Sequence, residues 1–162
     1  MRILKLFVIS VVVLFLLLTA MSALLPSTVR ISRAVDINAP VEKVRLQLED
    51  LNQWEEWNEY VKAMHQKDIS LDTIRSNELK VWKTTTDMST VQTMWQRQNG
   101  KTFPGIFHLF NSPSATTVQW YFEFKFNWYP WEKFGSIVYD KQIGPQMEQS
   151  LSNLKLLIEK AP

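Results

Sequence analysis

Residues that could carry out acid–base or metal chemistry are few in this chain. Its two histidines, His65 and His108, belong to no metal-ligand or catalytic-triad spacing. His108 lies in the segment FPGIFHLF, on the parity opposite Phe107 and Leu109, which is typical of a solvent-facing or structural residue. We therefore assign neither histidine a catalytic role.

The carboxylates gather in one stretch, at Glu49–Asp50 and Glu55–Glu56, with Glu59 beyond. Paired carboxylates can act as general acid and base when burial raises the pKa of one of them. Here they stand among lysines and arginines on the outward side of predicted short helices, so we interpret them as a solvated face. Asp50 suits a loop or cap position, because aspartate readily accepts hydrogen bonds from nearby backbone amides.

No sequence motif adds catalytic machinery. HExxH, GxSxG, GxGxxG and Walker sequences are absent, and the lack of cysteine excludes disulfides and thiolate metal sites. We expect no catalytic residue, no metal and no cofactor. All acidic residues, and all basic residues except Arg2 and Lys5, follow residue 26, so residues 27–162 are formally neutral. A neutral domain lacks the basic footprint of nucleic-acid binding, and we expect no nucleic-acid partner.

The strongest pattern in the chain is the segment TTVQWYFEFKFNW, from Thr116 to Trp128. Strict alternation predicts a strand with one dry and one wet face, about 43 Å long at about 3.3 Å per residue. The wet face carries Gln119, Glu123 and Lys125, with Tyr121 among them. The dry face carries Val118, Trp120, Phe122, Phe124, Phe126 and Trp128.

A long C-terminal helix is the predicted cover for this dry face. It begins before Pro145 and is expected to kink there, because proline in a helix removes a backbone hydrogen bond. One face of this helix carries Ile143, Met147, Leu151, Leu154 and Ile158. Tyr129, Trp131 and Phe134, which precede this face, form a second aromatic group suited to a pocket mouth or a bilayer interface.

The remaining elements are predicted from shorter patterns. Val29 to Ile37 alternates as a first strand of about ten residues, with Arg33 on the apolar parity and therefore expected near an open end of the sheet. Two short helices follow, and turn signals such as Asn99–Gly100 separate the strands of an antiparallel meander. The meander strands are expected over Ile69–Ile74, Leu79–Thr86, Ser89–Arg97 and Thr102–Phe110.

Two patches of the chain carry a further pattern. The first contains Ile37, Asn38, Ala39, Pro40, Val44, Asp50, Trp54 and Trp57. The second contains Lys141, Ile143, Gly144, Glu148, Leu151, Asn153, Leu154 and Lys155. Together the two patches frame residues 28–160 and resemble the START-like superfamily, whose members are often labelled polyketide cyclase/dehydrase or SRPBCC. Ser150 stands where relatives often carry glycine.

The resemblance implies an α+β helix-grip fold for residues 27–162. In this fold a curved antiparallel sheet, with two short helices after its first strand, is crossed on its concave face by the long C-terminal helix. The resemblance also implies that the space between sheet and helix holds apolar small molecules or lipids.

Residues 1–26 form a separate N-terminal segment. Leu6 to Leu25 contains no charge and, as a helix, would be about 30 Å long, which matches a bilayer core. Arg2 and Lys5 precede it, so the positive-inside rule predicts a single-pass anchor over residues 6–25, with a cytoplasmic N-terminus and the domain on the outer side. A signal peptide cleaved near Ala20–Ser22 is the alternative.

Three functions fit these features. The first is a membrane-tethered module that binds a hydrophobic small molecule or lipid. The second is a protein-interaction or stress-response module whose cavity is filled by its own side chains. The third is a cyclase, dehydratase or hydrolase, for which the inward parity offers only Arg33, Arg97 and Lys83, and an arginine is a poor general base. The candidate pocket walls are Trp120, Phe122, Phe124, Phe126, Met147, Leu151, Leu154 and Arg33.

Overall fold

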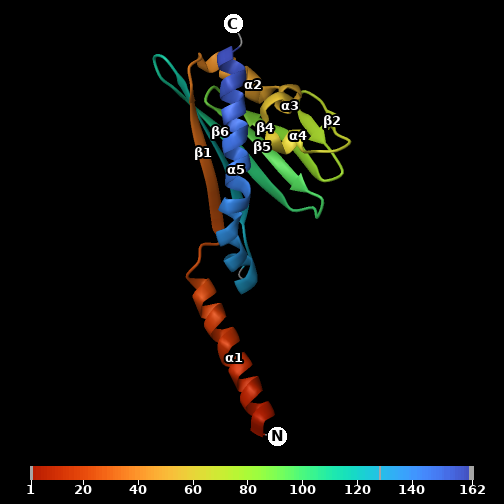
Figure 1. Ribbon diagram of the computed structural model, residues 1–162, viewed down its shortest axis with the longest axis vertical. Coiled ribbons are helices and arrows are strands. Elements are labelled where there is room, and N and C mark those ends of the chain that lie inside the picture. Colours follow the sequence, from red (N-terminus) through yellow and green to blue (C-terminus); the bar gives the residue numbers. More distant parts are fainter. Residues whose placement is uncertain (1, 128, 161–162) are drawn as a thin grey trace.

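A computed structural model describes residues 2–127 and 129–160. It contains an apolar N-terminal helix, α1 (Arg2–Ala23), which extends away from an α+β domain (Figure 1). Side chains along most of α1 are exposed, and the mean hydropathy reaches 2.8 over its best window. By length and composition, α1 qualifies as a membrane span or a signal sequence.

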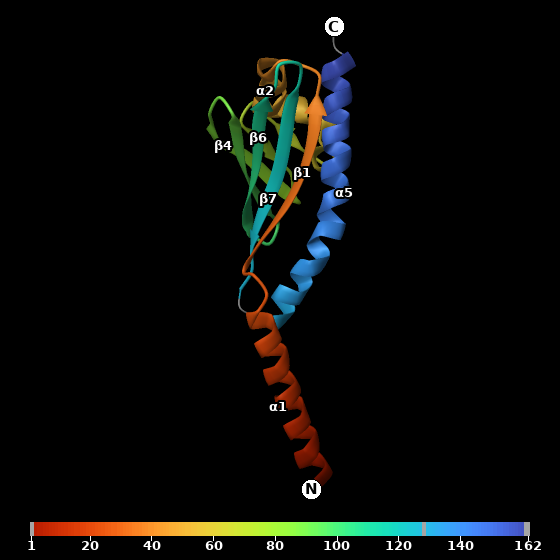
Figure 2. The same ribbon diagram turned by 90° about the vertical axis from the view of Figure 1, so that its left-hand side faces the viewer.

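The domain is built on a seven-stranded antiparallel sheet with the order β1-β7-β6-β5-β4-β3-β2. The chain therefore runs along the sheet as a meander from β2 to β7, and β1 joins the β7 edge (Figure 2). The strands are β1 (Thr28–Ile37), β2 (Asp68–Ile69), β3 (Thr73–Arg75), β4 (Leu79–Thr86), β5 (Thr90–Arg97), β6 (Thr102–Asn111) and β7 (Thr116–Lys125).

The aromatic alternation of β7 is confirmed, and it pairs along its full length with β1. Val118, Trp120, Phe122 and Phe124 are all buried. The strand is shorter than expected, because it ends at Lys125, and Trp128 lies outside the described residues. The expected strand over Ile69–Ile74 is wrong, because a turn at Ser70 divides it into β2 and β3.

Short helical segments connect β1 to β2. The first of the two predicted short helices is confirmed as α2 (Val41–Glu49), and the second is a chain of three pieces: η1 (Leu51–Gln53), α3 (Trp54–Trp57) and α4 (Glu59–Lys62). The carboxylate of Asp50 caps η1 by accepting from Asn52 N at 3.0 Å. The side chain of Asn58 caps α4 in the same way.

The long helix α5 (Pro130–Lys160) lies along the concave side of the sheet, which confirms the helix-grip arrangement. It begins before Pro145, as predicted, and Figure 2 shows that it bends along its length. Tyr60 Oη donates to the Ile143 carbonyl at 2.9 Å, so α4 is tied to α5 close to this proline. Ser150 Oγ donates to Gln146 O and accepts from Glu59 N at 2.9 Å, a second tie between the same helices.

Candidate functional site

The space between sheet and helix is filled at the end of the domain far from α1. Trp54 and Trp57 enter it from α3 and meet Phe107 of β6 and Trp120 of β7, with Phe107 and Trp120 stacked at 4.9 Å between centroids. All four side chains are fully buried. This aromatic cluster is the main core of the domain.

Five of the predicted wall residues belong to this packed interior. Met147, Leu151 and Leu154 present the inner face of α5, and none is more than 1% exposed. Trp120 and Phe122 are equally buried, and their rings lie 5.0 Å apart. These five residues therefore belong to the packed core behind the open part of the space.

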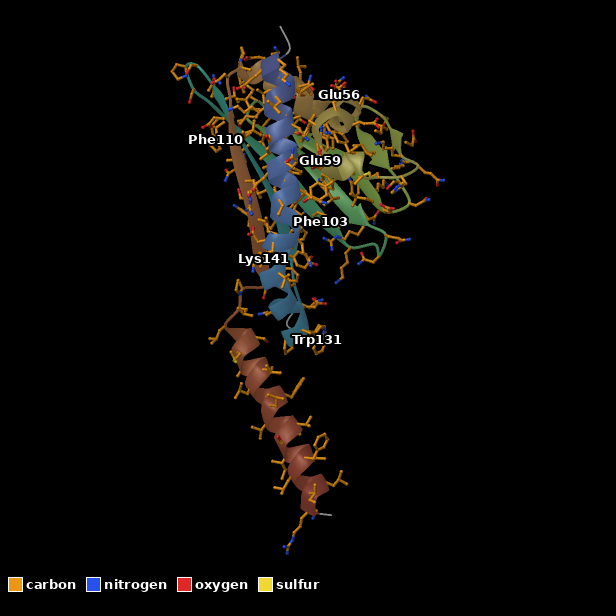
Figure 3. All side chains as sticks on the ribbon, viewed as in Figure 1. Glu56, Glu59, Phe103, Phe110, Trp131 and Lys141 are labelled. Atoms are coloured by element: carbon orange, nitrogen blue, oxygen red, sulfur yellow. The ribbon has the colours of Figure 1, made fainter. Side chains whose placement is uncertain are left out.

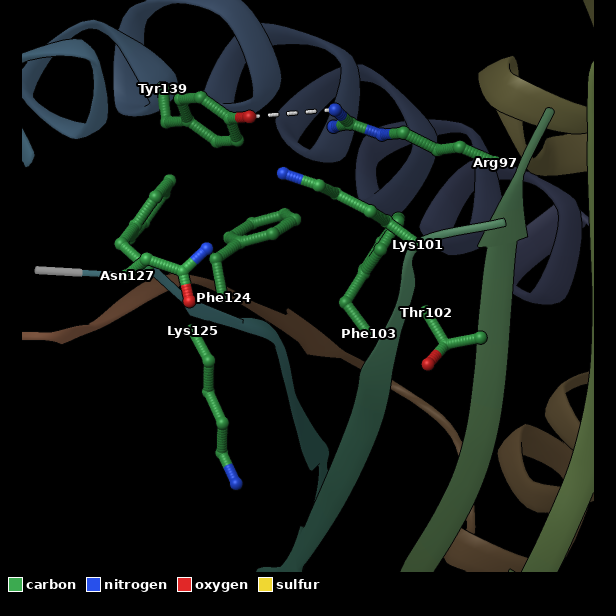
Figure 4. Close-up of a pocket in the computed structure, with 9 residues that line it drawn as sticks. Arg97, Lys101, Thr102, Phe103, Phe124, Lys125, Asn127 and Tyr139 are labelled. Atoms are coloured by element: carbon green, nitrogen blue, oxygen red, sulfur yellow. Dashed lines mark hydrogen bonds between the residues drawn. The ribbon is translucent and has the colours of Figure 1, made fainter. Parts of the chain in front are cut away.

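A pocket of about 250 Å³ opens at the other end, between the last residues of β7 and the first half of α5 (Figure 4). Two predicted wall residues, Phe124 and Phe126, line it. The Tyr139 ring of α5 packs 5.1 Å from Phe124 and 5.2 Å from Phe126. Phe103 of β6 completes the aromatic wall at 4.8 Å from Phe124. The remaining lining residues are Arg97, Lys101, Thr102, Lys125 and Asn127.

Arg97, the last residue of β5, reaches into this pocket over three aromatic rings. Its guanidinium carbon lies 5.3 Å from the Phe103 centroid, 5.9 Å from Phe124 and 5.6 Å from Tyr139. Cation–π contacts of this kind contribute about 0.5–2 kcal/mol each, depending on desolvation. Arg97 Nη1 also lies 3.5 Å from Tyr139 Oη, the bond drawn in Figure 4.

The loop between β7 and α5 borders the pocket. The Asn127 backbone N–H donates to Glu132 Oε2 at 2.9 Å, and this hydrogen bond, with smaller help from the Lys101 charge, lowers the pKa of Glu132. Lys101 Nζ lies 3.8 Å from the other oxygen of that carboxylate. The rim is therefore mainly basic, with one carboxylate held by the loop backbone.

Arg33 points inward as predicted, but it lies at the centre of β1 and not at an open end of the sheet. It forms ion pairs with two carboxylates of α5, Asp140 at 3.0 Å and Glu148 at 2.6 Å. Desolvation lowers the pKa of the Arg33 guanidinium, yet the bonds to Glu148 and Asp140 outweigh it and raise the pKa. The guanidinium occupies the space beside Gly144 that a side chain there would fill. Arg33 therefore links β1 to α5 through these two ion pairs.

Tyr60 lies between the filled end and the pocket. Its ring meets Trp95, Trp120 and Phe122 edge-on at 5.7–6.0 Å. Burial raises the pKa of the Tyr60 phenol well above its ordinary value, although the nearby charges of Arg97 and Arg33 act to lower it. The phenol therefore stays protonated and serves as the hydrogen-bond donor to α5.

Both histidines lie outside this pocket. His108 is on the outer face of the sheet, where its Nδ1 is 3.1 Å from Thr90 Oγ1 and its ring stacks on Tyr121 at 5.5 Å. His65 is exposed near Glu78. In the part of the chain that the structure describes, no group of three or more histidine or acidic side chains is arranged to hold a metal ion.

Sequence reasoning overlooked Phe103, Lys101 and Tyr139 as site residues. Phe103 shares its parity with Phe107, so the alternation of β6 already placed it inward. Tyr139 precedes Ile143 by four residues and therefore extends the predicted apolar face of α5 by one turn. Lys101 carried no such signal, because it lies in the turn after Gly100.

Comparisons with solved structures show the same fold in proteins of low sequence identity. A START superfamily protein from Mycobacterium smegmatis has 17% identity and a TM-score of 0.58, over 82% of this chain and 99% of that one. CalU16 from Micromonospora echinospora has 14% identity and a TM-score of 0.58, over 82% and 76%. DynU16, from the dynemicin biosynthetic locus, has 14% identity and a TM-score of 0.57; 83% of this chain aligns, but it spans only 48% of DynU16.

No curated protein sequence matches the chain. A family model does: residues 28–159 match the family described as polyketide cyclase/dehydrase and lipid transport. This match covers every strand and nearly all of α5, and it agrees with the helix-grip fold and with the resemblance seen in the sequence. The chain therefore belongs to the polyketide cyclase/dehydrase and lipid transport family, as a START-like, SRPBCC-type ligand-binding domain preceded by an apolar helix.

Proposed function

We propose that this chain is a membrane-tethered module that binds a hydrophobic small molecule or lipid in the pocket at the α1 end of the domain. The observation that carries the proposal is the position of the pocket. Phe126, one of its walls, donates its backbone N–H to Ser27 O at 2.8 Å, four residues beyond the end of α1 at Ala23. A ligand leaving a bilayer crossed by α1 would have only a short distance to travel.

The tether in this proposal is residues 6–25, which comprise most of α1 and the two residues after it, with the N-terminus in the cytoplasm and the domain on the outer side. Lys133 Nζ donates to the Leu25 carbonyl at 2.8 Å, which supports a fixed approach of α5 to the membrane end. Tyr129 and Trp131 stack at 4.9 Å, and both are exposed. Figure 3 shows Trp131 at the end of the domain next to α1. Such aromatic residues favour the headgroup region of a bilayer.

The pocket suits part of an amphiphile. Its volume of about 250 Å³ lies just below the roughly 300–1,000 Å³ that is usual for small-molecule sites, so it accommodates only part of a larger ligand. Phe124 and Phe126 are its proposed contact residues, and Trp120, Phe122, Met147, Leu151 and Leu154 are its supports. The family description includes lipid transport, which supports a lipid as one class of ligand.

The alternative is a protein-interaction or stress-response module whose interior is closed by its own side chains. The observation that favours it is the aromatic cluster, which fills the domain beyond the pocket. On this alternative the pocket is a surface hollow and binds nothing apolar.

Native mass spectrometry of the full chain separates these functions. The protein is released from detergent micelles, its adducts are recorded, and the adducts are identified after denaturing extraction. A discrete apolar adduct is expected. A protein that stays free of adducts after incubation with membrane lipids would contradict ligand binding and favour the protein-interaction module. The intact mass also reports whether the chain has been cleaved after Ser22, which would exclude a permanent tether.

A further inference from the structure

The two arginines that face the space beneath α5 differ in how their charge is met. Arg33 has two carboxylate partners, Asp140 and Glu148. Arg97, in contrast, forms no ion pair with any carboxylate of the described residues. Within the described residues, the charge of Arg33 is therefore paired with carboxylates, whereas the charge of Arg97 is not.

The surroundings of Arg97 raise the free-energy cost of leaving its charge without a carboxylate partner. The residue is only partly exposed, and three aromatic rings replace water on its sides. A guanidinium has five N–H donors, and apart from the 3.5 Å contact with Tyr139 Oη the side chain makes no hydrogen bond within the described residues. A partly buried cation with free donors favours an anionic partner, since charge-assisted hydrogen bonds are the strong ones.

A second cation supports the same partner. Figure 4 shows the ammonium group of Lys101 on the Arg97 side of the pocket, above the ring of Phe124, whereas Lys125 points away. Lys101 is largely exposed and makes one loose contact at 3.8 Å with Glu132, so it remains available to a ligand. Among the described residues none that lines the pocket is acidic, and Glu132 stands outside this lining at the rim.

Apolar and cationic groups therefore share one pocket. Phe103 and Phe124 are at most 9% exposed and present ring faces to it, while Arg97 and Lys101 stand at its rim. A purely apolar ligand would use the rings and leave the cations unpaired. A free inorganic anion would use the cations and leave the rings uncovered.

We propose that the pocket binds an amphiphile with an acidic group, a carboxylate or a phosphate, which Arg97 and Lys101 hold while its hydrocarbon part packs on Phe103, Phe124 and Phe126. This inference rests on the proposed ligand-binding function and names its ligand class. It assigns Arg97 the task of selecting charged amphiphiles over neutral ones of the same chain length.

The test uses the full chain in phosphatidylcholine nanodiscs that contain a diazirine-labelled fatty acid or the matching fatty alcohol at equal mole fraction. After photolysis, peptides carrying Phe103 or Phe124 are quantified. The acid is expected to label them about tenfold more than the alcohol, as one charge-assisted hydrogen bond allows. Arg97→Gln is expected to abolish that preference. Arg30→Gln is the matched control, because Arg30 makes a cation–π contact with Tyr121 on the outer face of the sheet.

Competitors identify the source of the acidic group. If phosphatidic acid in the nanodisc competes with the probe, the ligand is a phosphate-bearing lipid. If unlabelled fatty acid competes and phosphatidic acid does not, the ligand is a carboxylate-bearing lipid. If inorganic phosphate competes as well as either lipid, the proposal that the ligand is an amphiphile is wrong. Equal labelling of the pocket by acid and alcohol would overturn the anionic group and leave the binding function intact. Absence of pocket labelling by both probes would overturn both proposals.

Discussion

Phe124 and Tyr121 provide a matched pair of aromatic residues on β7. Both are buried, at 6% and 8% exposure, but they lie on opposite faces of the strand. Phe124 lines the pocket, whereas Tyr121 lies under Arg30 at 4.4 Å on the outer face. Removing either ring should cost similar stability, yet only one removal takes away ligand contact.

We expect Phe124→Ala to weaken binding of a photoreactive lipid about tenfold, since one ring face contributes on the order of 1.5 kcal/mol. Tyr121→Ala is expected to change binding much less at the same degree of folding. Binding is measured by labelling of the full chain in nanodiscs, and folding by circular dichroism. Equal losses of lipid binding in the two variants would show that Phe124 is not part of the binding site.

Ser150 makes a similar comparison possible for stability. Its side chain is fully buried and is the hydrogen-bond acceptor for Glu59 N. Ser150→Ala leaves that backbone donor without its partner, which should lower the free energy of unfolding by about 1–3 kcal/mol. Ser152→Ala, on the exposed side of α5, should have almost no effect. Chemical denaturation of both variants checks this, and similar midpoints would show that water replaces the hydroxyl.

At the scale of the elements, two glycines allow close approach for different reasons. A Cβ at Gly105 of β6 would lie 2.6 Å from Trp95 Nε1 and 2.8 Å from Phe122 Cε1, both parts of rigid buried rings. A Cβ at Gly144 of α5 would meet only the tip of the Arg33 side chain, which can move. The same methyl group therefore strains a packed core in one case and displaces a surface-accessible cation in the other.

We expect Gly105→Ala to destabilise the domain by about 1–3 kcal/mol through overpacking. Gly144→Ala should be close to neutral. Alanine gains about 0.5–1 kcal/mol in a helix interior, and this gain offsets the weakening of the two ion pairs of Arg33, whose carboxylates are exposed and which are worth about 0–1 kcal/mol each. Thermal unfolding distinguishes the two variants. A large loss in Gly144→Ala would mean that the Arg33 contacts hold α5 more strongly than their exposure suggests.

The start of α5 should respond to pH through Glu132. The Asn127 N–H bond lowers the pKa of this carboxyl in the folded chain, so its stabilising effect is complete above the unfolded pKa, about 4.3, and is lost as the pH falls through the lower folded value. Glu132→Gln should therefore be less stable than the unaltered chain at pH 7, and the difference should shrink below pH 4. Thermal unfolding across this range checks it, with Glu42→Gln as the control on the exposed face of α2. A pH-independent difference would contradict the role of ionisation.

These elements also show how far the sequence alone predicts the structure. The alternation from Val118 to Phe124 specified the buried face of β7, because period-two burial leaves an unambiguous pattern. The same alternation did not locate the pocket. Which half of the dry face is open depends on Trp54, Trp57 and Trp95, whose rings fill the far half only after the chain has folded.

At the scale of the whole molecule, the filled and open ends of the domain have different neighbours. Figure 2 shows the β6–β7 hairpin at the end of the domain opposite to α1. The aromatic cluster with Phe107 and Trp120 lies towards that hairpin, and the pocket, whose wall residue Phe126 is bonded to Ser27, lies towards α1. If α1 crosses a bilayer, the first turn of α5 must lie at its surface, because Lys133 is bonded to Leu25 just beyond α1. The exposed Tyr129–Trp131 stack would then rest among the lipid head groups.

Because the chain has no cysteine, single spin labels can test this orientation directly. In full chain reconstituted in vesicles, a nitroxide on Trp131→Cys should collide with dissolved oxygen more than with a polar nickel reagent, as interfacial depth requires. A nitroxide on Ser114→Cys, in the exposed turn between β6 and β7, should show the reverse. Similar accessibilities at both positions would mean that the domain stands away from the bilayer, and a lipid would then have to cross water to reach Phe124.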